Sequence, residues 1–471
     1  MADGIRVRDP VHNFIELTEE EVKLLATPLL QRLRRIRQLA LACLVYPGAI
    51  HTRFDHTLGV CNVAGMVAKG LRLNSHESRL VRLAALLHDL GHGPFSHVSE
   101  HVLDRYANRD SLPAGQKKEK IHEVITGHLI GHDQAIIHLL GKCVCDQIAR
   151  LLSRGHGQPV LRSIISGPLD ADKQDYLLRD SYFCGVQYGV FDLHQLHRSF
   201  TLIGPEDEKE LAIGPDGVRA LEQFVLAKYY LTTNVYRHRV RLITDQMIIR
   251  AIVLGIEEDN LEELRAIYAF ENSDEFFNRY VLWDDGRLTQ GFDAAAKPGT
   301  LCGALFARLQ RRELLKQVYH ERLQDLPDPK IREKLLGIGK PGNDALRKRI
   351  EEAIASVLTA NLGRDVDRRF VILHGFNVQS VRTESRNDEA SIMIAATPNP
   401  RPFEDYSALF QSIKEGYADG SVDVYAPVAW ETRADRRKIR DSLRDLIRAK
   451  IEAITKDALE QEEPEKKNDQ R

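Results

Sequence analysis

The residues with the clearest potential for chemistry lie in the stretch HDLGHGPFSH, positions 88–97. It holds three histidines and one aspartate around two glycines and a proline. Residues 83–87 before it are apolar and predict a buried helical turn, so His88 and Asp89 follow a buried element. A buried carboxylate needs a partner, and a divalent cation would satisfy both the carboxylate and the imidazole.

The distribution of histidines favours a metal over a simple hydrogen-bonded His-Asp pair, which would be the plainer interpretation of an isolated pair. Eleven of the eighteen histidines lie in one segment of fewer than ninety residues, which indicates a site. They are residues 51, 56, 76, 88, 92, 97, 101, 122, 128, 132 and 138.

The glycines and the proline of this stretch predict a turn. Gly91 and Gly93 allow backbone conformations that are closed to other residues, and Pro94 can open a new helix. That helix would carry His97 and Glu100 one turn apart. We therefore expect His88, Asp89, His92 and His97 to point toward one cavity.

Two further stretches supply candidate ligands. HTRFDHTLGV (51–60) offers His56, with Arg53 about one helical turn earlier. DADKQDYLLRD (170–180) offers Asp172, and as a helix it would gather a tyrosine and several charges within about 120° of arc. The members of this arc are Asp172, Lys173, Tyr176, Arg179 and Asp180.

The predicted ligand set is His56, His88, Asp89 and Asp172, a mixture of nitrogen and oxygen donors. Such a set suits manganese, iron, zinc or nickel, and more weakly magnesium, whereas structural zinc usually takes thiolates. A metal with open positions can activate water and neutralise charge on a phosphate.

The elements that must position these residues are mainly helical. Helical periodicity dominates 1–255 and continues through 256–365, where LRKRIEEAIASVL (346–358) is amphipathic. RFVILHGF (369–376), ASIMIAA (390–396) and VDVYAPV (422–428) predict strands of a small α/β subdomain over 366–456, which ends in an amphipathic helix at 435–454. The polar residues 457–471 predict a disordered tail.

The order His56, His88-Asp89, Asp172 resembles that of the HD-domain metal phosphohydrolases, and more closely that of the deoxynucleoside triphosphate triphosphohydrolases. The resemblance covers about the first 250 residues, and VDVYAP (422–427) adds a weak C-terminal similarity. The similar stretches are DPVHNFIEL (9–17), TPLLQRLRRIRQL (27–39), VYPGAIHTRFDHTLGV (45–60), HDLGHGPFSH (88–97), IHE (121–123) and DKQDYLLRD (172–180).

This resemblance implies a helical HD-domain core with a small α/β C-terminal subdomain, and an enzyme that cleaves a dNTP into a deoxynucleoside and inorganic triphosphate. It assigns His97 as general acid, His92 to the α-phosphate, and Glu100, His122 and Glu123 as supporting residues. The substrate-binding residues that it implies are Gln38, Leu39, Arg53, Lys173, Tyr176, Asp180, Lys228, Thr232 and Tyr236.

Departures from the family pattern bear on selectivity and regulation. At the positions of Lys228 and Thr232, the vertebrate deoxynucleoside triphosphate triphosphohydrolase has an arginine and a histidine. The resemblance therefore says less about how this chain would bind the triphosphate and the sugar. Gln31 and Arg34 match the guanine-activator site of that enzyme, but Ala26 replaces an aspartate and Arg8 an asparagine. An activating nucleotide could still bind among the arginines at 6, 8, 32, 34, 35 and 37, which could equally form a solvated or subunit-facing helix.

Two other classes of function stay open. A different HD phosphohydrolase, such as a nuclease or a signalling-nucleotide phosphodiesterase, would use the same metal ligands but give no special reason for Gln38, Tyr176, Asp180 and Tyr236. A nucleotide-sensing regulatory subunit would not need His97. Nucleic acid is not expected as the main partner, because no long basic track with aromatic platforms is present.

Composition agrees with a cytoplasmic protein without a membrane segment. The net charge is −2 and the six cysteines lack the spacing of a zinc knuckle or a disulfide framework. The family resemblance implies a homo-oligomer, a dimer or tetramer. The amphipathic segments 346–358 and 435–454 could supply its contacts, although core packing explains them equally well.

Overall fold

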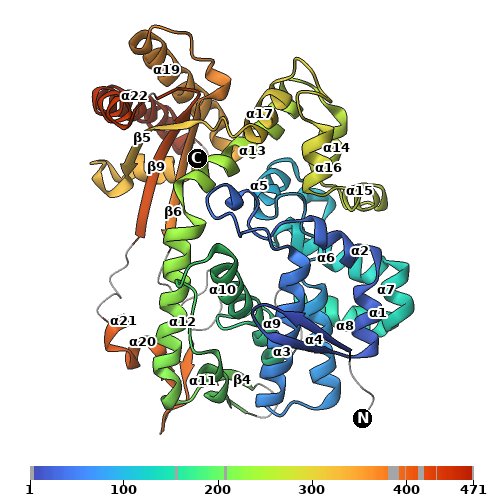
Figure 1. The fold of residues 1–471 in the computed structure, drawn as a ribbon. Coiled ribbons are helices and arrows are strands. Elements are labelled where there is room, and N and C mark those ends of the chain that lie inside the picture. Colours follow the sequence, from blue (N-terminus) through green and yellow to red (C-terminus); the bar gives the residue numbers. More distant parts are fainter. Residues whose placement is uncertain are drawn as a thin grey trace. The chain divides into compact units, whose positions relative to one another are not determined.

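The computed structural model describes residues 5–153, 158–205, 209–379, 392–397, 399–411, 418–430 and 432–468 (Figure 1). The chain forms two compact units that interleave along the sequence. The first contains Met1–Arg241, Glu262–Gly291 and Ser380–Gly416, and the second contains Leu242–Leu261, Phe292–Gln379 and Tyr417–Arg471.

The first unit is a helical body with two small sheets. Its helices are α1 (Glu19–Leu25), α2 (Pro28–Arg32), α3 (Arg53–Gly70), α4 (Ser75–Leu87), α5 (His97–Tyr106), α6 (Ile121–His132), α7 (Gln134–Leu140), α8 (Lys142–Leu152), α9 (Pro159–Ile165), α10 (Ala171–Cys184), α11 (Leu193–Arg198), α12 (Val218–Leu231), α14 (Glu262–Tyr268), α15 (Asp274–Tyr280), α16 (Asp285–Gly291), α20 (Phe403–Tyr406) and α21 (Ala408–Gln411).

The strands of this unit form a hairpin and a four-stranded sheet. Strands β1 and β2 pair antiparallel, and the second sheet has the order β3-β4-β7-β8 with a parallel β4–β7 pair. The strands are β1 (Ile5–Asp9), β2 (Asn13–Leu17), β3 (Phe200–Ile203), β4 (Glu210–Ile213), β7 (Met393–Ile394) and β8 (Arg401–Pro402).

Helices α3 and α10 carry the predicted ligands His56 and Asp172, α4 leads directly to His88 and Asp89, and α3 packs against both of the other helices (Figure 1). Local sequence fixes where each begins. Thr52 and Asp55 form a capping box for α3, Asn74 and Glu77 do the same for α4, and Asp170 accepts a hydrogen bond from the Lys173 backbone N–H at the start of α10. The buried face of α4 is apolar, and that of α3 is apolar apart from Arg53, His56 and Thr57, so apolar packing sets their mutual orientation.

The second unit packs helices onto a three-stranded antiparallel sheet of order β5-β9-β6. One sheet face, with Val318, Leu373, Val422 and Val424, shares a hydrophobic core with α18, α19 and α22. The elements are α13 (Arg239–Glu257), which enters this unit at residue 242, α17 (Leu301–Gln310), β5 (Lys316–Arg322), α18 (Pro329–Leu336), α19 (Asp344–Leu362), β6 (Ile372–Gln379), β9 (Ala418–Ala426) and α22 (Arg433–Asn468).

The predicted fold class, mainly helical with an α/β portion toward the C-terminus, is confirmed. The strands are distributed differently from the prediction. Strand β5 arises within 256–365, which was expected to be helical throughout, because Val318 and Tyr319 are needed to complete the sheet core. β7, from the expected strand at 390–396, joins the sheet of the other unit; residues 390 and 391 lie outside the described residues.

The C-terminal helix also departs from expectation. Residues 457–468, predicted as part of a disordered tail, continue α22, because Ala458 and Leu459 pack against the sheet core and Lys334 forms an ion pair with Glu462. Residues 469–471 lie outside the described residues. On the expected apolar stripe of this helix Leu443 and Ile447 are buried, but Leu446 is 47% exposed. The stripe therefore serves mainly core packing.

Candidate metal-binding and phosphohydrolase site

The three side chains His56, His88 and Asp172 converge at one point. One ligand atom from each lies within 4.8 Å of the others. His56 Nε2 is 2.8 Å from Asp172 Oδ1, and His88 Nε2 is 3.8 Å from the same oxygen. His56 comes from α3, His88 follows the last residue of α4, and Asp172 lies in the first turn of α10. Three segments distant in sequence thus build one candidate metal site.

Both imidazoles are oriented by a hydrogen bond from the nitrogen that faces away from this point. His56 Nδ1 donates to Asp175 Oδ2 at 2.8 Å, and His88 Nδ1 donates to the Ala85 carbonyl at 2.7 Å. Each ring therefore presents Nε2 to the site. His88 Nε2 is buried and has no hydrogen-bond partner among the described residues. A metal ion would supply the contact that this nitrogen lacks, so the residues fit a divalent cation.

Asp89, the fourth predicted ligand, lies beside this group and also forms an ion pair with Arg53. Its Oδ2 accepts a hydrogen bond from Arg53 Nη1 at 2.6 Å and lies 4.0 Å from His56 Nε2. Its Oδ1 is 3.2 Å from His88 Nε2 and 3.3 Å from His92 Nε2. Asp89 is thus placed to reach the candidate metal with one oxygen while Arg53 holds the other.

The charges around the candidate metal favour a cation. Burial alone would lower the pKa of His56, but hydrogen bonds to Asp172 and Asp175 raise that pKa to about 10. Burial opposes ionisation of Asp172 and Asp89, yet contact with His56 lowers the pKa of Asp172, and the charge of Arg53 lowers that of Asp89. The carboxylates are therefore ionised at neutral pH, the condition in which they bind a metal.

A buried network behind His56 was not predicted from the sequence. Asp175 is fully buried and accepts hydrogen bonds from His56, from His12 Nε2 at 2.6 Å and from Arg179 Nε at 2.8 Å. Arg179, also fully buried, donates to Asp9 Oδ2 at 2.9 Å. A carboxylate three residues after Asp172 on a helix was a usable signal, but its direction, away from the metal, depends on the packing of α10 on α3.

Gly59 explains why these two helices can approach so closely. It lies one turn after His56 on α3, and a Cβ at this position would fall 1.9 Å from Asp175 Oδ1 and 2.4 Å from Arg179 Nη2. Neither charged side chain can move far, because each is held by several hydrogen bonds. The glycine in HTLG thus admits the network that orients His56.

Replacing Asp175 with Asn should weaken metal binding without removing any direct ligand. An Asn side chain has one oxygen and one NH2 group, and the NH2 group would face an N–H donor of His12, Arg179 or His56. Asn would therefore not hold the His56 ring as the carboxylate does. Loss of such an orienting carboxylate typically costs about 10- to 100-fold in metal affinity. Calorimetric titration with manganese would measure this loss, and thermal unfolding would check the fold.

The matched control for this experiment is Asp170→Asn, which alters a buried carboxylate at the start of the same helix. Asn is as good a cap as Asp, and Asp170 does not contact His56 among the hydrogen bonds of the site. Its manganese affinity should stay within about threefold of the wild type. Equal affinities of Asp175→Asn and the wild type would contradict the orienting role.

The turn between α4 and α5 differs from the predicted one. The positive φ angles occur at Phe95 and Ser96, both at 59°, and not at the glycines. Gly91 and Gly93 are required for close packing instead: a Cβ would lie 2.1 Å from the His122 carbonyl at Gly91 and 2.4 Å from the Tyr280 hydroxyl at Gly93. Helix α5 begins at His97, three residues beyond the expected Pro94, because the strained turn occupies 94–96.

Three further histidines form a cluster beside the metal group. The His92 ring stacks on His122 with 4.2 Å between centroids and meets His97 edge-on at 5.2 Å. His122 Nδ1 forms a very short hydrogen bond with Glu100. Glu123 instead bonds to the backbone N–H of Lys120 at the start of α6. The structure thus brings together His92, His97, His122 and Glu100, and places Glu123 in a helix cap.

The protonation of this cluster is set mainly by its surroundings. Burial and the charge of Arg53 lower the pKa of His92 to about 3, so His92 is a neutral imidazole. The surrounding protein and Arg53 also hold the pKa of His97 well below its usual range. Arg53 Nη2 lies 3.4 Å from His97 Nε2, so its charge adds to the effect of the surrounding protein. An anionic ligand at Arg53 would oppose this effect.

Four of the predicted substrate-binding residues, Gln38, Tyr176, Asp180 and Tyr236, are connected by contacts with one another or with His51. Tyr236 donates a hydrogen bond to Asp180 Oδ2 at 2.6 Å, and His51 Nε2 donates to Asp180 Oδ1 at 2.7 Å. The Tyr176 and Tyr236 rings are nearly perpendicular, 6.1 Å apart. Gln38 is buried, its backbone N–H bonds to the His51 carbonyl, and its Oε1 has no hydrogen-bond partner among the described residues.

Several of the other predicted substrate-binding residues already have partners within the protein. Arg53 is buried and holds Asp89 and Ser96, while Lys173 forms an ion pair with Asp170 at 2.5 Å. The Thr232 hydroxyl donates to the Lys228 carbonyl at 2.7 Å. Residues Thr232–Tyr236 form a π-helical turn that follows α12 directly. Leu39 is buried next to Gln38.

The two arginines of the predicted activator site, Arg8 and Arg34, each lie over a different aromatic ring. The Arg8 guanidinium lies 4.6 Å above the Phe14 ring, and that of Arg34 lies 3.6 Å above Phe54. Gln31 joins Arg34 through a 3.0 Å hydrogen bond. Arg32, expected in the same basic cluster, is buried and belongs to the core. A nucleotide at Gln31 and Arg34 stays a prediction.

Comparison with known families agrees with this geometry. Residues 53–176 match the HD domain, a range that includes all four predicted ligands, and residues 191–452 match the HD associated region. The fold and the His-His-Asp group are those of an HD domain with a candidate metal site. The chain belongs to the family in which an HD domain is followed by an HD associated region.

The chain is similar both to an uncharacterized protein and to a named enzyme. An uncharacterized protein of Methanocaldococcus jannaschii is 37% identical over 256 residues, 54% of this chain and 51% of that protein. The deoxynucleoside triphosphate triphosphohydrolase SAMHD1 of Danio rerio is 31% identical over 278 residues, 52% of this chain and 44% of that protein. The chain spans about half the length of the curated relatives it matches.

A solved structure supports the fold. A phosphohydrolase from Bacteroides thetaiotaomicron aligns with a TM-score of 0.69 at 22% identity, covering 90% of this chain and all of that one. Among the described residues, no helix has the length and apolar character that a bilayer span requires.

Proposed function

We propose that this chain is a metal-dependent triphosphohydrolase that cleaves a deoxynucleoside triphosphate into a deoxynucleoside and inorganic triphosphate. The observation that carries the proposal is the spacing of three side chains along helix α10. Its residues Asp172, Tyr176 and Asp180 follow one another at intervals of one turn, so a candidate metal ligand and two sugar-facing side chains share one helix face. A phosphate beside the metal and a sugar beside Tyr176 would then belong to one nucleotide.

The polar wall around Asp180 supports a sugar rather than a bare phosphate. Asp180 is held on both oxygens, by His51 and by Tyr236, so its position is fixed before a ligand binds. The hydrogen bond from the Tyr236 hydroxyl to Asp180 fixes the Tyr236 ring. A deoxyribose could pack on this ring, whereas the 2′-hydroxyl of a ribose would be crowded. The Gln38 side-chain oxygen is available on the same wall to accept a hydrogen bond from the nucleoside.

The ionised ligands suit a divalent cation, which when bound would supply Lewis-acid activation of water and neutralise charge on phosphate. His56, His88 and Asp172 would hold it, with Asp89 at its side. Arg53 brings positive charge to the phosphates through a guanidinium already fixed by Asp89 and Ser96. His97, at the start of α5, is placed to give a proton to the departing 5′-oxygen, and Arg53 and the phosphates together set its pKa.

The proposal predicts a distinctive product pattern. Purified protein with manganese or magnesium should convert at least one dNTP to a deoxynucleoside and triphosphate, resolved by chromatography. ATP and GTP serve as controls, and pairs of dNTPs test whether a second nucleotide activates the enzyme. Release of monophosphate or pyrophosphate would contradict the proposal. No turnover with any metal would favour a nuclease or signalling-nucleotide phosphodiesterase, to be tested on single-stranded DNA and RNA.

A further inference from the structure

The segment 280–285, here called the bracing segment, contacts the strained turn that leads to His97 at several points. The Tyr280 hydroxyl donates to the Gly91 carbonyl at 3.1 Å and fills the space beside Gly93. Arg32, buried, links the Trp283 carbonyl at 3.0 Å to the His92 carbonyl at 2.8 Å. These contacts reach the turn from residues about 190 positions away, within the HD associated region and outside the HD domain match.

Asp285, at the end of the bracing segment, makes the most direct contact. Its Oδ1 accepts a hydrogen bond from the Phe95 backbone N–H at 2.7 Å. Its Oδ2 accepts one from the Arg37 backbone N–H at 3.0 Å, next to Gln38 on the nucleoside wall. One carboxylate therefore ties the turn before His97 to the segment that carries Gln38.

The turn has a physical need for such a contact. Phe95 and Ser96 both have φ of 59°, a region that is unfavourable for residues with a Cβ. Such a conformation persists only when its surroundings hold it. The Phe95 N–H points to Asp285 in this conformation, and the next residues are Ser96, which holds Arg53, and His97.

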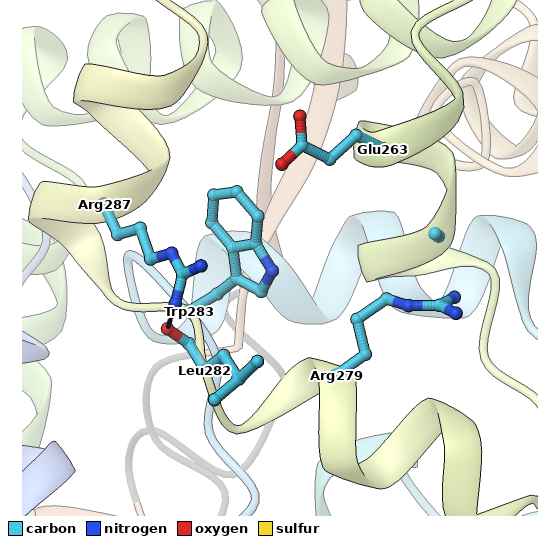
Figure 2. A pocket seen from close by; sticks show the side chains of 6 residues that line it. Glu263, Arg279, Leu282, Trp283 and Arg287 are labelled. Atoms are coloured by element: carbon cyan, nitrogen blue, oxygen red, sulfur yellow. Dashed lines mark hydrogen bonds between the residues drawn. The ribbon is translucent and has the colours of Figure 1, made fainter.

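The bracing segment is itself anchored. Figure 2 shows the Trp283 indole in a pocket between Arg287 and Glu263, with Arg279 and Leu282 nearby. The Arg287 guanidinium lies 4.8 Å from the indole centroid and donates to the Leu282 carbonyl at 3.0 Å. Arg287 therefore anchors the bracing segment through both the Trp283 ring and the Leu282 carbonyl.

We propose that Asp285 is a positioning residue: its carboxylate holds the 93–97 turn in the conformation that presents His97 to the substrate. This proposal rests on the proposed function, with His97 acting on the leaving group. Segment 36–39 has further support, because the Gln38 N–H bonds to the His51 carbonyl and the Arg53 N–H bonds to the Ile36 carbonyl. Removing the carboxylate should therefore disturb the turn more than the nucleoside wall.

The carboxylate is in the required state at neutral pH. The surrounding protein raises the pKa of Asp285 to about 6, while the N–H groups of Phe95 and Arg37 act in the opposite sense. The charged groups of Arg37, Asp284 and, through Asp284, Arg35 also face it, as does Arg32. Above this pKa both oxygens can accept a hydrogen bond, so the test belongs at about pH 7.5 to 8.

The experiment compares Asp285→Ala with the wild type by three measurements. Amide hydrogen exchange of a peptide covering 91–100 should accelerate about tenfold or more at Phe95. Turnover of the dNTP found by product analysis should fall about 10- to 100-fold in kcat, with KM within about threefold, because the general acid is misplaced while the nucleoside wall stays. Manganese affinity by calorimetry should stay within about threefold.

Asp284→Asn is the matched control. Asp284 accepts the Arg287 N–H at the start of α16, which Asn can also do, and its ion-pair partner Arg35 is 57% exposed, so water can solvate that guanidinium when the charge of Asp284 is removed. This control should keep wild-type exchange and kcat. If Asp285→Ala does not fold, Asp285→Asn preserves volume and one acceptor and should give a smaller change in the same direction.

Two results would overturn the proposal: unchanged exchange at Phe95 in both Asp285 variants, or a loss of kcat in Asp284→Asn as large as in Asp285→Ala. Failure of the proposed function looks different. A wild-type protein without dNTP turnover would reject the substrate assignment, and the exchange measurement would still decide whether Asp285 holds the turn.

Discussion

Replacement of Asp172 by Ala is expected to abolish both metal binding and hydrolysis. Asp172 is the one acid in the His-His-Asp group, and its oxygen lies within 3.8 Å of both imidazole Nε2 atoms. A bound metal contributes several kcal/mol to phosphoryl chemistry, so turnover should fall about 1,000-fold or more. Manganese titration by calorimetry, together with the dNTP assay, would measure both losses.

The fold should survive this change, because the Asp172 side chain is 35% exposed and α10 is capped by Asp170. Asp110→Ala, which removes an acid that is 94% exposed and remote in sequence, is the control and should retain metal binding and turnover. Hydrolysis by Asp172→Ala at the wild-type rate, with manganese bound, would reject this group as the metal site.

Replacement of His97 by Ala should separate metal binding from catalysis. His97 is not among the His-His-Asp ligands, so manganese should bind with affinity within about threefold of the wild type. A general acid contributes about 10²- to 10⁴-fold to rate, and turnover should fall by that amount. The loss should appear in kcat more than in KM, since Arg53, Tyr176 and Asp180 would still bind the nucleotide.

His138→Ala provides a control of the same residue type, since His138 is exposed on α7. It should leave both kcat and manganese affinity unchanged. A His97→Ala protein that loses manganese together with activity would assign His97 to the metal and not to proton transfer. A protein that keeps its full kcat would remove His97 from the chemistry.

The metal group was predictable because its residue types are rare in combination. His88-Asp89 after an apolar helix, a histidine in HTRFDH and an acid in DADK gave the mixed donor set directly, and the structure brings His56, His88 and Asp172 together. The turn that follows was predicted in place but not in mechanism. Glycine suggests a positive φ, yet here Gly91 and Gly93 make room for His122 and Tyr280. A close approach by distant residues leaves no local signal.

Asp175 and Asp285 show a second limit. Asp175 belongs to the same short motif as Asp172, but only the packing of α10 on α3 turns it toward His56, Arg179 and His12. Asp285 lies in WDDG, where a local interpretation gives a helix cap, and that description fits its neighbour Asp284. Its contact with Phe95 joins residues 190 positions apart.

The sequence by itself determined the helical periods, the helix starts at Thr52, Asn74 and Asp170, and the set of side chains able to bind a metal, because each depends on local spacing and chemistry. The tertiary structure decided which nitrogen of each histidine faces the candidate metal site, which acids orient the candidate ligands, and which strands share a sheet. These depend on contacts between segments far apart in the chain, where burial and hydrogen-bond geometry select one partner among many.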